Sequence, residues 1–293
     1  MKSKTLATGK THKEENFPVA SRLIGAEHRP IVLAFYRFAR AADDVSDDPV
    51  LSPAQKIARL AEMERNLTQE DAGSAAPEAA KLRVALAERH LTSRHAVDLL
   101  TAFRQDVVKR RYGDWDDLMS YCALSAMPVG RFVLDVHRES PTTWAASDAI
   151  CAALQIINHL QDCGADFRNL DRVYLPLDRL GAHSVEPEAL GAKAASPGLR
   201  AVIAEIAAKT ADLLREGQGL VDEIVDTRLR FEIAVVHALA VKLTDRLMRR
   251  DPLSEETHLS NFEAATTASV AIVRRATRLF GVSPRAFASG ARL

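Results

Sequence analysis

The sequence predicts an all-α protein built from packed amphipathic helices, and three observations support this class. Only 5% of the 293 residues are aromatic, and β-branched residues rarely alternate with polar ones. Apolar residues recur instead at three- and four-residue spacing, which is the period of a helix with one buried face. Hydrophobic residues make up 47% of the chain, which is enough to bury the core of one or two domains.

The expected helices are bounded by prolines, by capping residues and by loops of small polar residues. In chain order they are Pro30–Asp47, a second helix starting near Ser52-Pro53, Glu78–Leu91, Arg94–Arg111, Leu118–Arg138, Trp144–Asp166, Leu199–Val225, Leu229–Arg249 and Leu259–Phe280. Proline in its first turn and Pro49 after its acidic end bound the first helix. A loop rich in Gly, Ser, Ala and Asp over 68–77 ends the second, and a turn over 112–117 ends the fourth.

The later helices are predicted from their apolar spacing and from two breaks. Pro141 separates the fifth helix from the sixth, so these two helices should pack antiparallel. The stretch 181–198 carries prolines and glycines and should be the longest connection, after which three amphipathic segments complete the set.

Charge and cysteine content exclude several classes of protein. The chain has 39 basic and 39 acidic residues, so no global field attracts it to nucleic acid or to an anionic membrane, and any charge-based function must be local. The polar arm Met1–Glu15 does not lead into an apolar run, and Ile233–Leu243 is too short and too interrupted to span a bilayer. No C-x-x-C spacing joins Cys122, Cys151 and Cys163, so neither a disulfide framework nor a thiolate zinc site is indicated. A cytoplasmic location therefore fits best.

The first expected helix carries an acidic face at its C-terminal end. At about 100° per residue, one narrow arc holds Tyr36, Arg40, Asp43 and Asp47, and the opposite side holds Ile31, Phe35, Phe38 and Ala42. Together with Asp44 and Asp48, the aspartates occupy the negative end of the helix dipole, where each acid is unfavourable by about 0.3–1 kcal/mol. The run is either a solvated acidic helix end or a functional site.

A second acidic face, on the helix Trp144–Asp166, favours the functional interpretation. One arc of this helix holds Gln155, Asn158, Asp162 and Asp166, and the other holds Ile156, Ile157 and Leu160. Asp162 and Asp166 repel each other unless a cation lies between them. Two such faces opposite each other would hold two or three Mg²⁺ ions, which prefer oxygen ligands, whereas zinc is disfavoured. His159 lies beside this face and is interpreted as a packing residue.

Other catalytic arrangements receive little support from the sequence. Ser21, Asp135 and His137 are the residue types of a hydrolase triad, but no G-x-S-x-G turn or strand pattern accompanies them. Neither a Rossmann fingerprint nor a P-loop follows a predicted strand, so no nicotinamide-dependent step is expected.

The two acidic motifs, Asp43-Asp44-x-x-Asp47 and Gln155-x-x-Asn158-x-x-x-Asp162-x-x-x-Asp166, resemble those of the squalene and phytoene synthase family. The resemblance runs from Asn16 to about Pro176 and includes the motif Arg172-Val173-Tyr174-Leu175-Pro176. It implies one isoprenoid synthase domain over 16–285, folded as a helical bundle around a central cavity. A polar arm over 1–15 precedes this expected domain, and a tail over 286–293 follows it. In that family the motifs line opposite cavity walls, hold Mg²⁺ and bind the diphosphate of a prenyl substrate.

The resemblance also implies a role for each matching residue. The implied metal ligands are Asp43, Asp44, Asp47, Asn158, Asp162 and Asp166. The implied substrate-binding residues are Asn16, Tyr36, Arg40, Gln155 and Gln161. The implied catalytic residues are Asp43, Asp47, Asp162, Tyr36 and the cavity tyrosine Tyr121.

Within the family, three runs are similar to the bacterial branch that converts presqualene diphosphate to hydroxysqualene: Glu15–Ser21, Phe35–Arg40 and Ser125–Arg131. Asn16, Gln161 and the run 125–130 depart from the residues usual in phytoene and dehydrosqualene synthases. The resemblance therefore implies an Mg²⁺-dependent enzyme acting on an isoprenoid diphosphate. The alternatives are a family member that condenses two prenyl diphosphates to presqualene diphosphate, dehydrosqualene or phytoene, and a non-catalytic assembly factor. A lipid product leaves open a peripheral membrane contact and a hand-over of substrate from a presqualene diphosphate synthase.

Overall fold

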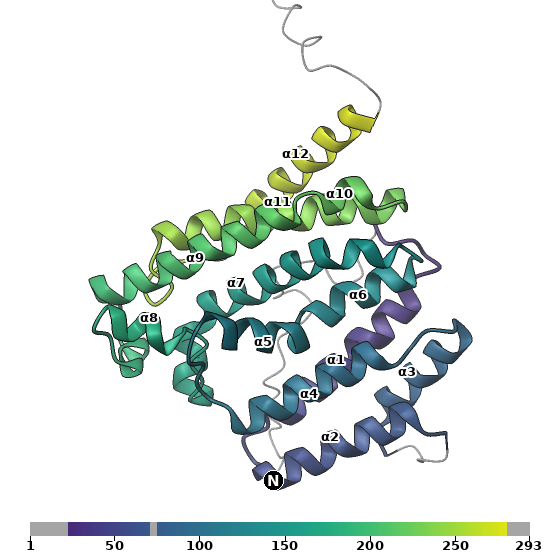
Figure 1. The fold of residues 1–293 in the computed structure, drawn as a ribbon, viewed down its shortest axis with the longest axis horizontal. Coiled ribbons are helices and arrows are strands. Elements are labelled where there is room, and N and C mark those ends of the chain that lie inside the picture. The colour runs from purple at the N-terminus through teal and green to yellow at the C-terminus, as the bar shows by residue number, and fades with distance from the viewer. Residues whose placement is uncertain (1–22, 71–74, 280–293) are drawn as a thin grey trace, which may run out of the picture. The chain divides into compact units, whose positions relative to one another are not determined.

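The computed structural model describes residues 23–70 and 75–279, and helices make up most of them (Figure 1). Within these ranges no strand forms, and the β-bridge between Arg111 and Val173 is isolated. The predicted all-α class is confirmed. The described residues form two compact units, one of residues 26–108 and one of residues 23–25 and 109–279.

The first unit is built from four helices: α1 (Arg29–Asp47), α2 (Pro53–Thr68), α3 (Pro77–Glu88) and α4 (Arg94–Val108). Both α1 and α2 pack against α3 and α4. The side chains at these contacts have no exposed surface, as at Phe38, Ala42, Leu60, Leu82 and Leu100. The predicted start of a helix near Ser52-Pro53 is confirmed, and Ser52 caps α2: its hydroxyl accepts a hydrogen bond from the Gln55 amide while the Gln55 side chain accepts one from the Ser52 amide.

The second unit is organised around one long central helix. Its elements are α5 (Trp115–Ser125), α6 (Met127–Val136), the 3₁₀ turn η1 (Pro141–Thr143), α7 (Trp144–Leu170), α8 (Leu177–Ala182), the 3₁₀ turn η2 (Pro187–Gly191), α9 (Pro197–Gly217), α10 (Leu220–Glu223), α11 (Thr227–Arg249) and α12 (Asn261–Leu279). With 27 residues, α7 is about 40 Å long. It packs against α5, α6, α9 and α11 (Figure 1), so neighbouring helices fix its position from several sides.

Two glycines allow neighbouring helices to lie unusually close to α7. A Cβ atom on Gly130 of α6 would stand 2.5 Å from the Cys151 sulfur. A Cβ atom on Gly217 of α9 would stand 2.8 Å from the carbonyl oxygen of Ala146. Atoms in close-packed protein interiors do not approach this closely, so α6 and α9 keep their distance from α7 only with glycine at these two positions.

Charged side chains also fix the helices around α7. The Arg131 guanidinium donates two hydrogen bonds to the Asp148 carboxylate, at 2.9 and 2.5 Å, which joins α6 to α7. Glu139 is buried, and its carboxylate accepts hydrogen bonds from the backbone amides of Val225 and Asp226 at 2.9 and 2.7 Å. The residues before α11 are thereby held against the turn that follows α6.

The prediction of one helix over Leu118–Arg138 is wrong, because the chain forms α5 and α6 with a break at Ala126. Pro128 has no N–H group to donate to the preceding turn, so a continuous helix would lose a hydrogen bond there. The predicted helix Leu199–Val225 is also divided, since α9 ends at Gly217 and the short α10 follows. Part of the expected connection 181–198 is helical as well, as η2.

Two further helix ends differ from the prediction because of long-range and capping contacts. The helix expected to reach Arg111 stops at Val108, since the segment after it bonds to residues 173–178. The helix expected to stop at Asp166 continues to Leu170, where Asp171 adopts a left-handed backbone conformation with φ of 53°. None of the helices within 23–70 and 75–279 is both long and apolar enough to cross a bilayer.

Candidate active site

The acidic face predicted for the first helix is present on α1. The apolar side is buried at Ile31, Phe35, Phe38 and Ala42, each at most 4% exposed. The opposite side is partly exposed at Tyr36, Arg40, Asp43 and Asp47. The helix ends at Asp47 with no basic residue in its last turn, so the aspartates do lie at the negative end of its dipole.

Arg40 holds two of the α1 carboxylates. Its Nη1 atom lies 2.8 Å from Oδ2 of Asp43 and its Nη2 atom lies 3.1 Å from Oδ1 of Asp44. The carboxylate of Asp47 accepts a hydrogen bond from the Ser46 hydroxyl at 3.3 Å. Lys56 of α2 also approaches this helix end, because its ammonium donates a hydrogen bond to the Ser46 carbonyl at 2.8 Å.

The pKa of Asp43 rises to about 7. Burial is the largest cause, and the nearby carboxylates of Asp47, Asp106 and Asp44 add to it against the lowering effect of Arg40. Because 35% of the Asp43 side chain is exposed, water screens part of this effect. The cluster therefore favours a bound positive charge, either a proton or a metal ion.

Asp106 of α4 is an acidic residue that the sequence analysis missed. It is only 6% exposed and acts on Asp43. A signal for it existed, because an aspartate on the buried face of an amphipathic helix is rare unless it has a partner or a function.

Asp48 has a different role from the three aspartates before it. Its Oδ1 atom accepts hydrogen bonds from the backbone amides of Val50 and Leu51, at 2.7 and 3.1 Å. These bonds hold the pKa of Asp48 below its ordinary value. Asp48 thus shapes the turn after α1, which is consistent with its absence from the predicted ligand set.

The polar face predicted for the second acidic motif is present on α7. Its apolar side is at most 1% exposed at Ile156, Ile157 and Leu160. Its polar side is half-buried at Gln155, Asn158, Asp162 and Asp166, and we name these four residues the α7 stripe. The carboxylates of Asp162 and Asp166 are one helical turn apart, and the stripe offers amide and carboxylate oxygens along three turns.

His159 lies among the residues of the α7 stripe, although the sequence analysis set it aside. Its Nε2 atom is 3.0 Å from Nε2 of Gln155, and its Nδ1 atom is 4.0 Å from Oδ2 of Asp166. Its ring stacks on that of Tyr174 with centroids 3.5 Å apart and planes 17° apart. The spacing of four residues from Gln155 and seven from Asp166 was the available signal, because both spacings return to the same helix face.

Tyr121 belongs to a buried group of aromatic rings beside His159. Tyr112, Tyr121 and Tyr174 are at most 6% exposed, and their ring centroids are 5.3–5.5 Å apart. The segment that carries Tyr174 is fixed by a hydrogen bond from the Val173 amide to the Arg110 carbonyl at 2.9 Å. The motif after α7 therefore supports the stripe through these rings.

The remaining predicted residues have separate outcomes. Gln161 is 6% exposed, in the middle of α7. Asn16, and Ser21 of the rejected triad, lie outside the described residues. Tyr36 is half-buried on α1. The roles of all predicted site residues, and the expectation that the two acidic faces lie opposite each other, stay predictions.

The three cysteines are free thiols, of which Cys122 and Cys163 are buried and Cys151 is partly exposed. Burial raises the pKa of Cys122 and Cys163 to about 12 and that of Cys151 to about 11. Thiols with such values stay protonated at neutral pH, and a protonated thiol is a poor metal ligand. Cysteine ligation therefore plays no part in this site.

The donor atoms of the two acidic faces fit Mg²⁺. Each face offers carboxylate oxygens, joined on α7 by amide oxygens, and Mg²⁺ takes oxygen ligands while keeping several of its waters. The structural observation that supports a cation is the clustering of carboxylates, with Asp43, Asp44 and Asp47 on one helix end and Asp106 acting on Asp43, because a divalent ion would relieve the repulsion among them.

Comparisons with known proteins agree with these features. A family model described as squalene/phytoene synthase matches residues 10–263. A hydroxysqualene synthase from Rhodopseudomonas palustris is 51% identical over 283 residues, which is 95% of each chain. One from Sinorhizobium fredii is 49% identical over 281 residues, 96% of this chain and 94% of the relative. The crystal structure of squalene synthase HpnC from Alicyclobacillus acidocaldarius superposes with a TM-score of 0.70 at 29% identity, covering 82% of this chain and 90% of that one.

Proposed function

The chain belongs to the squalene/phytoene synthase family, and from this premise we propose that it converts presqualene diphosphate and water to hydroxysqualene and diphosphate. The observation that carries the proposal is the identity of 51% and 49%, over nearly the whole chain, to two bacterial relatives named hydroxysqualene synthase. The acidic faces of α1 and α7 offer carboxylate oxygens that would hold Mg²⁺ for the departing diphosphate.

The proposed reaction begins with cleavage of the carbon–oxygen bond to the diphosphate, which departs with the bonding electron pair. The remaining carbocation rearranges by opening of the cyclopropane ring. The oxygen of one water molecule then bonds to the cation and loses a proton, which gives the alcohol. No electron donor enters this sequence, so the reaction needs no reduced nicotinamide.

We propose that residues of the acidic faces bind the diphosphate through Mg²⁺. The proposed ligands are Asp43, Asp44, Asp47, Asn158, Asp162 and Asp166. When bound, Mg²⁺ would neutralise the negative charge that develops on the leaving diphosphate. Arg40 keeps the α1 carboxylates in place through its contacts with Asp43 and Asp44, and we propose that it also contributes positive charge toward the substrate.

The other proposed contacts concern the carbon chains and the cation. Tyr36 and Tyr121 present aromatic rings, whose faces attract positive charge, and the burial of Tyr121 suits a wall that excludes bulk water. We assign Asn16, Gln155 and Gln161 to substrate binding. A substrate that already contains both prenyl chains has one diphosphate to ionise, which reduces the need for a basic residue at position 161.

The test is a product analysis with the purified full chain, presqualene diphosphate, Mg²⁺ and ¹⁸O-labelled water. We expect hydroxysqualene carrying one heavy oxygen, in the same yield with and without NADPH. A C30 hydrocarbon that forms only with NADPH would refute the capture of water. Efficient condensation of farnesyl or geranylgeranyl diphosphate would instead assign the chain to the condensing members of the family, and no turnover of any of these substrates would favour an assembly factor.

A further inference from the structure

The helix α12 leaves apolar side chains exposed along one side. Phe262, Val270 and Val273 are 77%, 49% and 60% exposed. At about 100° per residue they fall within an arc of roughly 80°, and about 16 Å of helix separates the first from the last. Thr266 lies within this arc and Ser269 lies beside it, while Glu263 lies about 20° beyond its edge at Val270. We name this side the α12 face.

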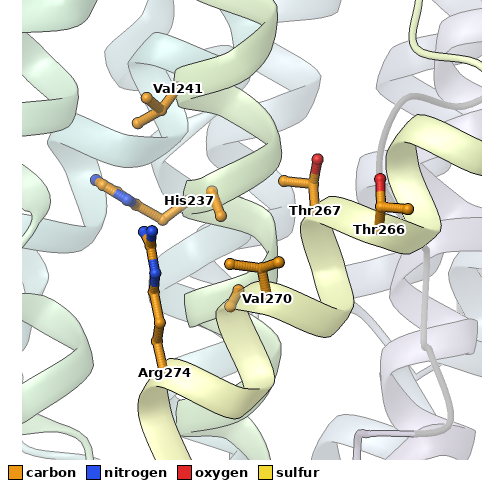
Figure 2. A pocket seen from close by; sticks show the side chains of 8 residues that line it. His237, Val241, Thr266, Thr267, Val270 and Arg274 are labelled. Atoms are coloured by element: carbon orange, nitrogen blue, oxygen red, sulfur yellow. The ribbon is translucent and has the colours of Figure 1, made fainter. Parts of the chain in front are cut away.

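A groove of about 430 Å³ continues the α12 face onto α11. Ala238 and Val241 of α11 line one wall, and Val270 and Ala271 of α12 line the other. Figure 2 shows Val270 and Arg274 projecting from successive turns of α12, with Val241 on the neighbouring helix. Val241 is 46% exposed, so the groove joins two large exposed apolar side chains, Val241 and Val270.

Positive charge adjoins this surface at the C-terminal half of α12. Arg274 lines the groove, Arg278 follows one turn later, and both are exposed. Asp222, the acid that approaches this end of the helix, already pairs with the buried Arg275. Glu263 lies three turns away and pairs with an arginine of α11. Arg278 also acts on Asp222, but three arginines, Arg274, Arg275 and Arg278, accompany this one acid, so positive charge remains for an anionic partner.

We propose that the α12 face docks on the surface of a membrane that contains anionic lipid. An apolar stripe beside arginines is the pattern of helices that lie in the membrane interface, where apolar side chains enter the acyl boundary and arginines contact lipid phosphates. Such a helix need not span the bilayer, in agreement with the polarity of the described helices. A second protein copy suits the surface less well, because a stable interface buries about 800 Å² per partner and this stripe presents three large apolar side chains.

This docking goes beyond the proposed reaction, and it would place the protein where a C30 lipid product is soluble. It is tested without any substrate, by sedimentation of the full chain with phosphatidylcholine vesicles that contain or lack phosphatidylglycerol. We expect binding to the anionic vesicles that weakens as salt is added. Neutralising Arg274 or Arg278 to Gln should lower the partition coefficient about fivefold each.

The apolar contribution is tested by Val270→Asp and Val273→Asp, each of which should lower binding to anionic vesicles by about tenfold or more. The matched control is Val84→Asp on α3, because Val84 and Val270 are both 49% exposed, and this variant should bind like the parent protein. Circular dichroism checks that each variant is folded.

Three outcomes would overturn the docking proposal: no sedimentation with anionic vesicles, equal losses in Val84→Asp and Val270→Asp, or a lipid-free dimer that Val273→Asp dissociates. The dimer would mean that a second copy covers the α12 face. Activity on detergent-dispersed presqualene diphosphate is measured separately, and we expect Val270→Asp to retain it. Failure of the proposed reaction and failure of the docking are thereby distinguishable.

Discussion

Replacement of His159 should weaken catalysis by an amount that follows from its two kinds of contact. His159 approaches Gln155 through a nitrogen atom at 3.0 Å and stacks on Tyr174 at 3.5 Å. His159→Phe keeps a stacked ring and loses the nitrogen atoms, whereas His159→Gln keeps a polar group and loses the ring. His159→Ala removes both contacts, so the three variants separate the two contributions.

Each contact has an expected magnitude. A partly buried neutral hydrogen bond contributes about 0.5–1.5 kcal/mol, and a stacked aromatic pair contributes about 0.5–1.5 kcal/mol beyond its buried area. If both contacts hold the α7 stripe in its reactive arrangement, His159→Ala loses about 1–3 kcal/mol of transition-state stabilisation, which is roughly a 5- to 150-fold lower kcat/KM. His159→Phe and His159→Gln should each lose roughly 2- to 13-fold.

The assay is diphosphate release from presqualene diphosphate as a function of Mg²⁺ concentration. Because Gln155 and Asp166 belong to the α7 stripe, we expect His159→Ala to need more Mg²⁺ for half-maximal rate, an effect that a loss of packing alone would not produce. His237→Phe on α11 is the control, since its Nε2 atom contacts the Leu214 carbonyl outside the stripe, and its activity should be unchanged. A folded His159→Ala protein with activity within about twofold of the parent and the parent's Mg²⁺ dependence would refute the reasoning.

Three further predictions concern the metal, the packing of α7 and the response to acid. Asp43→Asn and Asp162→Asn should lower Mg²⁺-dependent diphosphate release by about 100-fold or more in folded protein, because each removes an anionic oxygen ligand; activity that persists in excess EDTA would contradict this. Gly130→Ala should cost about 1–3 kcal/mol through overpacking, measured as a lower urea midpoint, and an unchanged midpoint would mean that α6 moves away without penalty. Burial acts to raise the pKa of Asp251, but hydrogen bonds from Ser254 and two backbone amides leave it below its ordinary value of 3.8. Asp251→Asn should therefore lower the free energy of unfolding at neutral pH. Well below pH 3.8 the variant and the parent should be equally stable, and a stability difference of the same size at both pH values would count against this assignment.

The two acidic faces were predictable because they depend only on the period of a helix. Ile156 and Leu160 repeat at helical spacing on the buried side of α7, and Asp162 and Asp166 repeat on the other. Local periodicity of this kind does not require knowledge of distant contacts. The break at Ala126 could also have been predicted, since the residue type that causes it, Pro128, is visible in the sequence.

Other features depend on parts of the chain that are far apart in sequence. The amphipathic pattern of α4 continues to Arg111, yet the helix stops at Val108 because the Arg110 carbonyl accepts a hydrogen bond from the Val173 amide. Asp106 affects Asp43 across 63 positions of sequence, and the stacking of His159 on a later tyrosine is equally non-local. The spacing of residues within one segment carries no information about contacts between segments that are far apart in sequence.

The close contacts at Gly130 and Gly217 also constrain how the protein can change over evolutionary time. Because a Cβ atom at either position would force neighbouring atoms to shift, we expect α7 to resist rotation when a residue on its buried side is substituted. Inherited changes should then fall mainly on the half-buried α7 stripe, while the direction of the helix is preserved. A saturation mutagenesis experiment should accordingly find tolerated and rejected substitutions alternating along α7 with the period of the helix, so that new substrates are reached by altering single stripe residues rather than by moving the helix that carries them.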